Sequence, residues 1–265
     1  MPDLRYHLIS LISVFLALAI GILLGVAMAD RGVISDQLQV EITKIRNQLS
    51  DQRGQIGKLQ ERTDQDNNMS EKMSDTMIAN KLVGRNVALV AGPWAQNDAV
   101  QSVESALSDS GANITSNIRL SEPDPSEATT VEITGETTTT TESVYTDDTR
   151  RVMEDASNTG TPDTVVLVGG GRVPEGAPNG AGRILRDSET AMIETWLGNG
   201  LNVIGAEGSN AGRSEIQLFK DTGISSVDNA DQPAGRAALV VIADTGADGS
   251  YGTKSSASDL FPPPG

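Results

Sequence analysis

Hydrophobic positions follow three different patterns along the chain, and the first is an apolar stretch from Leu8 to Met28 that contains no charged residue. About 20 apolar residues in a helix cross the ~30 Å hydrocarbon layer of a bilayer. We therefore predict a transmembrane anchor in residues 1–30. A cleaved signal peptide is the alternative, because Ala27-Met28-Ala29 resembles a cleavage site. The apolar stretch is, however, longer than the core of a secretory signal usually is.

Small residues recur every four positions within this stretch. In a helix they share one face, and such a face lets two helices approach closely in lipid. We predict self-association through this face, although glycine and alanine are also common in membrane helices for other reasons. The residues are Ala17, Gly21, Gly25 and Ala29.

The second pattern, in residues 31–80, is a heptad repeat on a charged background. Apolar side chains alternate spacings of four and three, which is typical of the a and d positions of a coiled coil. Gln52 is a polar exception that fixes register at some cost in stability. Because a lone helix cannot hide such a stripe, we predict a stalk that forms a homodimer. The seam residues are Leu38, Ile42, Ile45, Leu49, Ile56 and Leu59.

Three methionines follow the stalk seam. Met69, Met73 and Met77 are four residues apart and so lie on one helix face. Soft thioethers select Cu(I), and a dimer would bring two such rows together. The alternative is packing, because Met73 and Met77 fall at d and a, where methionine fills a seam adaptably.

The third pattern, in residues 84–260, alternates short apolar runs with helical segments. This alternation predicts an α/β fold, with a doubly wound, mostly parallel sheet covered by helices on both faces. The expected strands are 86–91, 112–120, 164–168, 201–204 and 237–243, and the expected helices are 95–110, 187–197 and 214–220.

Residues 121–148 interrupt this pattern. The segment is rich in acidic residues and threonine and contains neither lysine nor arginine. Because it has few side chains for a core, we predict a disordered surface insertion, with a short strand near Val131 as an alternative.

Charge and composition narrow the chemistry. The formal net charge of −16 argues against nucleic acid, whose phosphates need a basic face. There is no cysteine, which excludes disulfides and thiolate chemistry. The only histidine is His7, so the third region has no histidine base or histidine metal ligand. We therefore do not expect an enzyme.

Glycine-rich loops follow the expected strands, and ligands of open α/β sheets bind beyond the carboxyl ends of strands. A crevice bearing Arg172, Glu207 and Asp244 would make a small-ligand site, although any such sheet turns with glycine there. The stretch Asp228-Asn229-Ala230-Asp231 fits a turn better than a Ca²⁺ loop.

Several stretches resemble the actinobacterial family named after mycobacterial copper transport protein B (MctB). The resemblance begins with Leu4–Ser10 and continues through Val14–Gly25. It resumes in the last quarter of the chain, at Gly205–Glu207, Ser226–Asp231, Gly235–Val240 and Tyr251–Lys254.

The resemblance implies a cell-envelope protein associated with copper transport or efflux. Together with the predicted anchor and stalk, this resemblance gives our main hypothesis, a membrane-anchored homodimer. A short tail ahead of a first apolar segment commonly stays in the cytoplasm, so we expect a cytoplasmic N-terminus and an extracytoplasmic C-terminal domain. The first alternative is a non-catalytic coiled-coil scaffold in envelope or cell-separation machinery, which would need an envelope protein partner. The second alternative is a small-ligand sensor that uses the glycine-rich edge.

Overall fold

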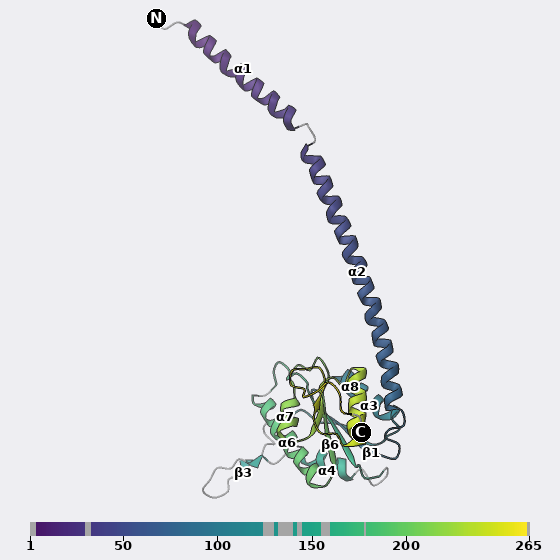
Figure 1. Ribbon diagram of the computed structural model, residues 1–265. Helices are drawn as coiled ribbons and strands as arrows, with labels where there is room; N and C mark the ends of the chain where they lie inside the picture. Colours follow the sequence, from purple (N-terminus) through teal and green to yellow (C-terminus); the bar gives the residue numbers. More distant parts are fainter. Residues whose placement is uncertain are drawn as a thin grey trace. The chain divides into compact units, whose positions relative to one another are not determined.

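The structure, a computed structural model, describes residues 4–29, 33–123, 130–131, 140–141, 145–154, 160–177 and 179–263. The chain forms two compact units, Met1–Asp64 and Gln65–Gly265. Figure 1 shows two long helices followed by a sheet with shorter helices around it.

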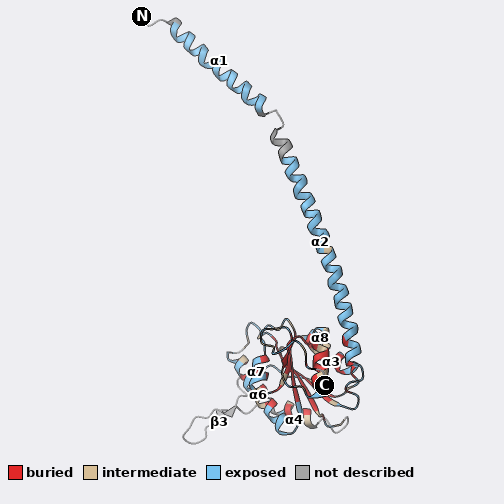
Figure 2. Ribbon diagram, viewed as in Figure 1, coloured by how far each residue is buried: buried red, intermediate tan, exposed pale blue. Residues whose placement is uncertain are grey.

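The first two helices contain most of the exposed apolar side chains of the described chain. Helix α1 spans Leu4–Ala29 and helix α2 spans Val33–Ile78. Every described side chain of α1 is exposed, and so are the stalk seam residues of α2 (Figure 2). Exposing this much apolar surface to water is unfavourable, so each helix is expected to be buried by lipid or by another helix.

One six-stranded sheet forms the centre of the second unit, and all of its strand pairs are parallel. Its strand order is β2-β1-β5-β6-β7-β8. The bounds of these strands, in chain order, are Asn86–Ala91 (β1), Asn113–Arg119 (β2), Thr164–Val168 (β5), Asn202–Ala206 (β6), Ser225–Val227 (β7) and Ser250–Tyr251 (β8).

Helices cover both faces of this sheet. One apolar cluster joins α3 and α8 to the sheet and includes Ile78 and Leu82 from the end of α2 and the turn after it. The other cluster joins α4, α6 and α7 to the opposite face. Figure 2 shows that the strands between these helices are buried. The helices span Asn97–Asp109 (α3), Thr146–Glu154 (α4), Ala181–Gly198 (α6), Ile216–Asp221 (α7) and Pro233–Thr245 (α8).

The mixed α/β class and the parallel sheet are therefore confirmed, and so are the strands that correspond to β1, β2, β5 and β6. Strands β1 and β5 are contiguous apolar runs of valine, leucine and alanine, which is what a strand buried on both faces requires.

The prediction of a strand at 237–243 is wrong, because these residues belong to helix α8. The helix begins with Pro233 at its first turn and ends before Gly246, whose φ of 69° is left-handed. It is apolar on nearly all sides, and such a run cannot be assigned to a strand or a helix by periodicity. The last strands of the sheet are instead β7 and β8, which are short and contain serine.

Part of the acidic insertion proposed for 121–148 lies outside the described residues. Two short strands, Thr130–Val131 (β3) and Thr140–Thr141 (β4), pair antiparallel within it. At its far end, Tyr145 is buried and donates a hydrogen bond of 2.8 Å to the Ser121 carbonyl oxygen. Helix α4 follows directly, so the last residues of the segment belong to the packed unit.

Candidate functional site

The methionine row lies on the last part of α2, within the unit Gln65–Gly265. Met69, Met73 and Met77 are 64%, 55% and 41% exposed. They line one side of the helix together with Gln65, Asn68, Lys72 and Thr76. The three thioethers are therefore accessible in the single chain.

The opposite side of this helix segment packs on the sheet unit. Ser74 and Ile78 are buried, and the Arg236 guanidinium on α8 forms an ion pair of 2.5 Å with the Glu71 carboxylate. Because these contacts hold α2 against α8, Met73 and Met77 border an apolar groove of about 300 Å³. Its lining is completed by Ser70, Ser74, Pro233, Ala234, Ala237 and Phe261. We call it the Met73/Met77 groove.

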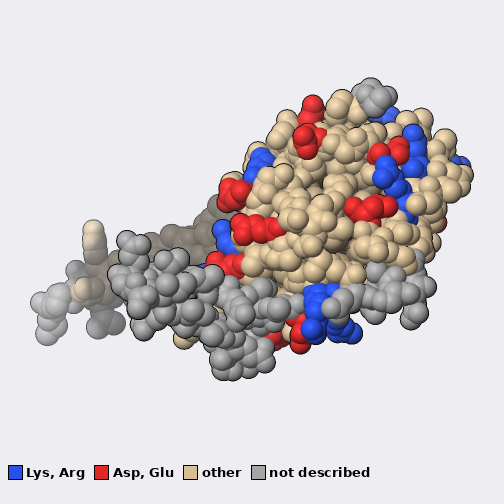
Figure 3. Space-filling model, turned by 90° about the horizontal axis from the view of Figure 1, so that it is seen from below, with Lys and Arg blue, Asp and Glu red and all other residues tan. Residues whose placement is uncertain are grey.

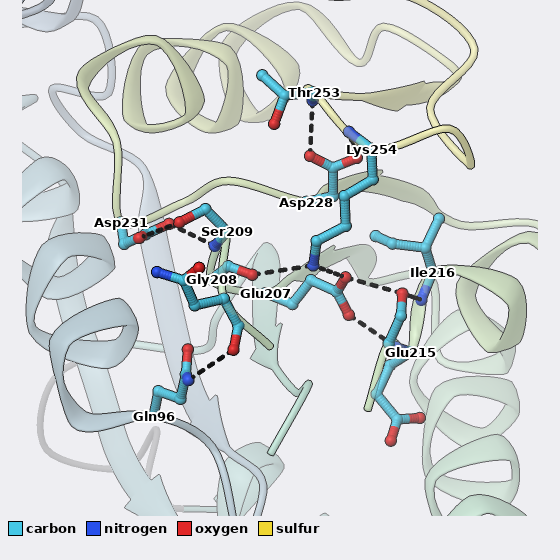
Figure 4. A network of polar contacts seen from close by, with 12 residues as sticks. Gln96, Glu207, Gly208, Ser209, Glu215, Ile216, Asp228, Asp231, Thr253 and Lys254 are labelled. Carbon is cyan, nitrogen blue, oxygen red and sulfur yellow. Dashed lines mark hydrogen bonds and ion pairs between the residues drawn. The ribbon is translucent and has the colours of Figure 1, made fainter. Parts of the chain in front are cut away.

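The second candidate site is a cluster of polar side chains at the carboxyl edge of the sheet (Figure 4). Glu207 follows β6, is fully buried and pairs with the Lys254 ammonium group at 2.5 Å. The Glu207 carboxylate also accepts hydrogen bonds from the Ser214 hydroxyl at 2.8 Å and the Glu215 backbone N–H at 2.7 Å. The charge is thus neutralised and its oxygens are used, as a buried carboxylate requires.

Neighbouring carboxylates in Figure 4 bind backbone groups in the same manner. Asp228 accepts hydrogen bonds from the backbone N–H groups of Thr253 and Lys254, at 2.8 and 3.0 Å. Asp231 accepts from the backbone N–H and hydroxyl of Ser209, both at 2.6 Å. Burial alone would raise the pKa of Asp231, but these hydrogen bonds outweigh it and lower the pKa. The cluster ties the segments after β6, β7 and β8 together.

Two further glutamates are buried below this cluster. Glu189 lies on α6 and Glu215 directly before α7, and their carboxyls are close enough for the charge of Glu215 to act on Glu189. Burial raises the pKa of both carboxyls, and for Glu189 the charge of Glu215 raises it further, whereas Arg213 and Arg186 oppose the shift. The pair therefore retains a proton at pH values where an exposed glutamate would be ionised.

The structure does not join the three crevice residues expected from the sequence. Arg172 is exposed after β5, whereas Glu207 is buried with Lys254. Asp244 lies in the last turn of α8 and pairs with Lys81 at 3.7 Å, because the expected strand is a helix. Lys254 was missed by sequence reasoning, since it is 47 positions from Glu207 and no spacing indicates the pair.

The glycine-rich turns at this edge pack closely against other parts of the protein, and a Cβ atom at Gly169, Gly170 or Gly208 would overlap a neighbouring side chain. A Cβ atom at Gly171 would overlap the carbonyl oxygen of Trp94, so the loops after β1 and β5 touch. Among the described residues, no group of three or more histidine, cysteine, aspartate or glutamate side chains could hold a metal ion. The exposed methionines are the remaining soft-metal candidates.

Charge on the sheet unit is mixed rather than one-sided. In the view of Figure 3, most of the face is uncharged, and small groups of acidic and of basic side chains are scattered over it, many near its edges. Several of the residues behind the net charge of −16, Glu132 and Glu136 among them, lie outside the described part of the chain.

Comparison with known proteins decides the family. The family model described as copper transport outer membrane protein, MctB, matches residues 1–155. The chain belongs to the MctB family. The predicted resemblance is therefore confirmed over the first part of the chain, which includes the Leu4–Gly25 stretches. The stretches quoted between Gly205 and Lys254 lie beyond the matched residues.

The chain is also similar to curated MctB proteins. It is 31% identical over 132 residues to the copper transporter MctB of Mycobacterium bovis and to that of Mycobacterium tuberculosis. The alignment covers 46% of this chain and 38% of each relative, so the match spans less than half of either. MctB proteins are named for copper transport, which is not a known enzyme class.

Within the described part of this MctB-family chain, helix α1 is the one helix long and apolar enough to cross a membrane. From Tyr6 to Met28 it has 23 residues, and its length and composition suffice to cross a bilayer. It lies within the residues that match the family model.

Proposed function

We propose that this chain is a single-pass envelope protein that takes part in copper transport. The observation that carries the proposal is the MctB family match, which includes the apolar helix α1 and the whole of α2. The same match favours this role over the scaffold and the ligand sensor.

The proposed orientation has a cytoplasmic N-terminus and an extracytoplasmic sheet domain. The support is that a short tail before a first apolar segment commonly remains in the cytoplasm. Because the chain has no cysteine, a single Ser108→Cys substitution on exposed α3 gives an unambiguous label site. We expect a membrane-impermeant maleimide to label it in intact cells whose outer layers admit the reagent. Labelling only after the inner membrane is permeabilised would show that the sheet domain is cytoplasmic and would contradict the proposed orientation.

The proposed assembly is a parallel homodimer, formed by the small-residue face of α1 and the coiled-coil seam of α2. The support is exposure: Leu38, Ile42 and Leu49 lie on one stripe and are 52%, 48% and 45% exposed in the single chain. A second copy would bury that stripe, as coiled-coil partners do. The sheet domain that follows is proposed to be doubly wound, since it has an apolar cluster on each face.

Disulfide crosslinking of the full-length protein in membranes tests the dimer. Gln52→Cys places a thiol at a d position, and we expect it to give a covalent dimer under mild oxidation. Asn47→Cys, at an outward f position five residues away, is the matched control and should stay monomeric. Equal crosslinking of the two variants would indicate random collision, and an uncrosslinked Gln52→Cys chain would contradict the seam.

The proposed copper contacts are Met69, Met73 and Met77. Their thioethers are soft ligands of the kind that Cu(I) prefers. They are exposed on one helix face. Because the described residues contain only one histidine and the chain has no cysteine, stronger soft ligands do not compete with them.

Anaerobic titration of the full-length protein in detergent, against a chromophoric Cu(I) chelator, tests this role. We expect the protein to withdraw Cu(I) from the chelator, and the Met69→Leu/Met73→Leu/Met77→Leu variant to lose that capacity. Met28→Leu is the matched control, because Met28 is also an exposed helical methionine. Unchanged Cu(I) affinity in the triple variant would show that the methionines do not bind copper. If the wild-type protein binds no Cu(I), it has no direct role in handling copper.

A further inference from the structure

One helix cannot direct all three thioethers to a single ion. Residues four apart in an α-helix are separated by about 6 Å along the axis, so Met69 and Met77 are about 12 Å apart. Helical side chains all lean toward the N-terminus, and this common tilt does not bring the two ends of the row together. A single helix can therefore offer two neighbouring thioethers at most, whereas Cu(I) takes up to about four soft ligands.

The heptad register shows which two are best placed. Counted from Ile56 at a, Met77 falls at a and Met73 at d, whereas Met69 falls at the flanking g position. In a parallel, in-register pair, each a or d layer brings the side chains of both helices to the axis. Met73 and Met77 thus occupy adjacent layers, and two copies of the chain would place four thioethers around one point.

The contacts of α2 leave this face open to another helix. The sheet unit covers Ser74 and Ile78, while Met73 and Met77 stay 55% and 41% exposed beside the Met73/Met77 groove. The groove wall, which includes Pro233 and Phe261, is apolar and would shield a bound ion from water. Lys72 is at position c, away from the seam, and its long side chain can keep its ammonium group in water.

We propose that Met73 and Met77, together with the same two residues of a second copy, form one Cu(I) site shared across the dimer. This inference rests on the dimer and the copper role proposed above. The layers before the site are polar, with Thr63, Asp66 and Ser70 at seam positions. Because these polar layers pair the two helices only weakly, a shared Cu(I) ion would hold together the ends of α2 from the two copies.

Stoichiometry and single-site variants test the shared site. In the anaerobic titration of the full-length protein we expect about one Cu(I) per two chains. Met73→Leu/Met77→Leu should abolish binding, whereas Met69→Leu should retain both affinity and stoichiometry. Leucine keeps the volume and helix propensity of methionine, so these variants should fold. One ion per chain, or loss of binding in Met69→Leu alone, would overturn the shared site.

Breaking the dimer far from the methionines separates this inference from the role it rests on. Ile42→Asp/Leu49→Asp puts charges into two a layers of the stalk, and Asn47→Asp/Ser50→Asp adds the same charges at outward f and b positions. Both are made in a chain that carries Gly21→Leu and Gly25→Leu, so that the stalk and not the face of α1 holds the dimer. We expect the first variant to be monomeric by light scattering and to lose Cu(I), and the second to keep both properties. If the monomer retains full affinity, the shared site is wrong while the copper role stands. If the wild-type chain binds no Cu(I), both are wrong.

Discussion

The two units of the chain treat their apolar side chains in opposite ways. In Met1–Asp64, the described apolar residues of α1 and α2 are exposed, from Tyr6 through Leu59. In Gln65–Gly265, apolar residues fill two clusters, one on each face of a parallel sheet. The second unit therefore has a hydrophobic core of its own, whereas the apolar side chains of the first would be buried only in the lipid and the helix pair proposed above.

Buried charge shows the same difference. The second unit holds Glu207, Glu189 and Glu215 inside the protein; Lys254 neutralises Glu207, and burial raises the pKa of the other two carboxyls. Such groups need a fixed surrounding, because a lost partner leaves a charge without solvation. The first unit is built from exposed side chains that solvent or another helix can reach. Substitutions should thus affect one unit and leave the other unchanged.

The largest effect is expected from removing the partner of the buried Glu207. Lys254→Met should lower the free energy of unfolding of the sheet unit by about 3 kcal/mol, because the buried Glu207 carboxylate is then left without a positive partner. Trp94 and Trp196 are the two tryptophans of the chain, and both lie in this unit. Their fluorescence during chemical denaturation of the full-length protein in detergent therefore measures this unit alone.

The control for this substitution is Lys81→Met, at the exposed pair with Asp244, where the loss should stay below about 1 kcal/mol. Replacing both partners, as Glu207→Gln/Lys254→Met, should recover much of the loss because no charge is then left buried. An effect of Lys254→Met no larger than that of Lys81→Met would show that the Glu207 pair contributes little.

The sequence predicted the part of this architecture that depends on local pattern. Strands β1, β5 and β6 are each, after a polar first residue, short runs without a polar side chain, and the exposed stripe of α2 follows from a repeat of seven. Helix α8 was assigned to a strand because its run of alanine, leucine, valine and isoleucine is buried on nearly all sides, which removes the periodicity that separates the two structures. Strands β7 and β8 were missed because they are two or three residues long and rich in serine.

The candidate functional residues show the same difference between what local sequence pattern predicts and what it does not. The methionine row is a property of spacing along one helix, so its common face could be inferred from sequence. The partner of Glu207 could not, since Lys254 reaches it only through the order of β6, β7 and β8 in the sheet. Asp244 was misplaced for the same reason as α8. Pairings between distant segments thus required the tertiary structure.

A smaller effect, with a distinct pH dependence, is expected at the buried carboxyls of Glu189 and Glu215. The pKa of Glu189 in the folded unit lies above its ordinary value of 4.5, so the folded state binds more protons than the unfolded state between these two values. The stability of the sheet unit is therefore greatest below the ordinary pKa and is lost as pH rises through the folded pKa. Glu189→Gln removes this loss.

We expect Glu189→Gln to raise the free energy of unfolding at pH values above the ordinary glutamate pKa of 4.5 and to flatten its decline as the pH rises from there. Tryptophan fluorescence again provides the measurement. Glu194→Gln, on the exposed side of the same helix, is the control and should leave the pH dependence as it is. A variant at Glu189 that keeps the wild-type slope would show that the carboxyl pair is not its source.

The smallest effect is expected from the same substitution, glycine to alanine, made once in each unit. Gly54 lies inside α2 at an outward f position, and a Cβ there meets nothing within 4 Å. Gly84 also has open space around it, but its φ of 81° is left-handed. Alanine favours the helix by about 1 kcal/mol at the first position and is strained by a similar amount at the second. We expect Gly54→Ala to raise the thermal midpoint of the helical circular dichroism signal without changing tryptophan fluorescence, and Gly84→Ala to lower the midpoint seen by fluorescence. Since neither substitution adds a contact, a shift of both signals by either variant would mean that the two units unfold together.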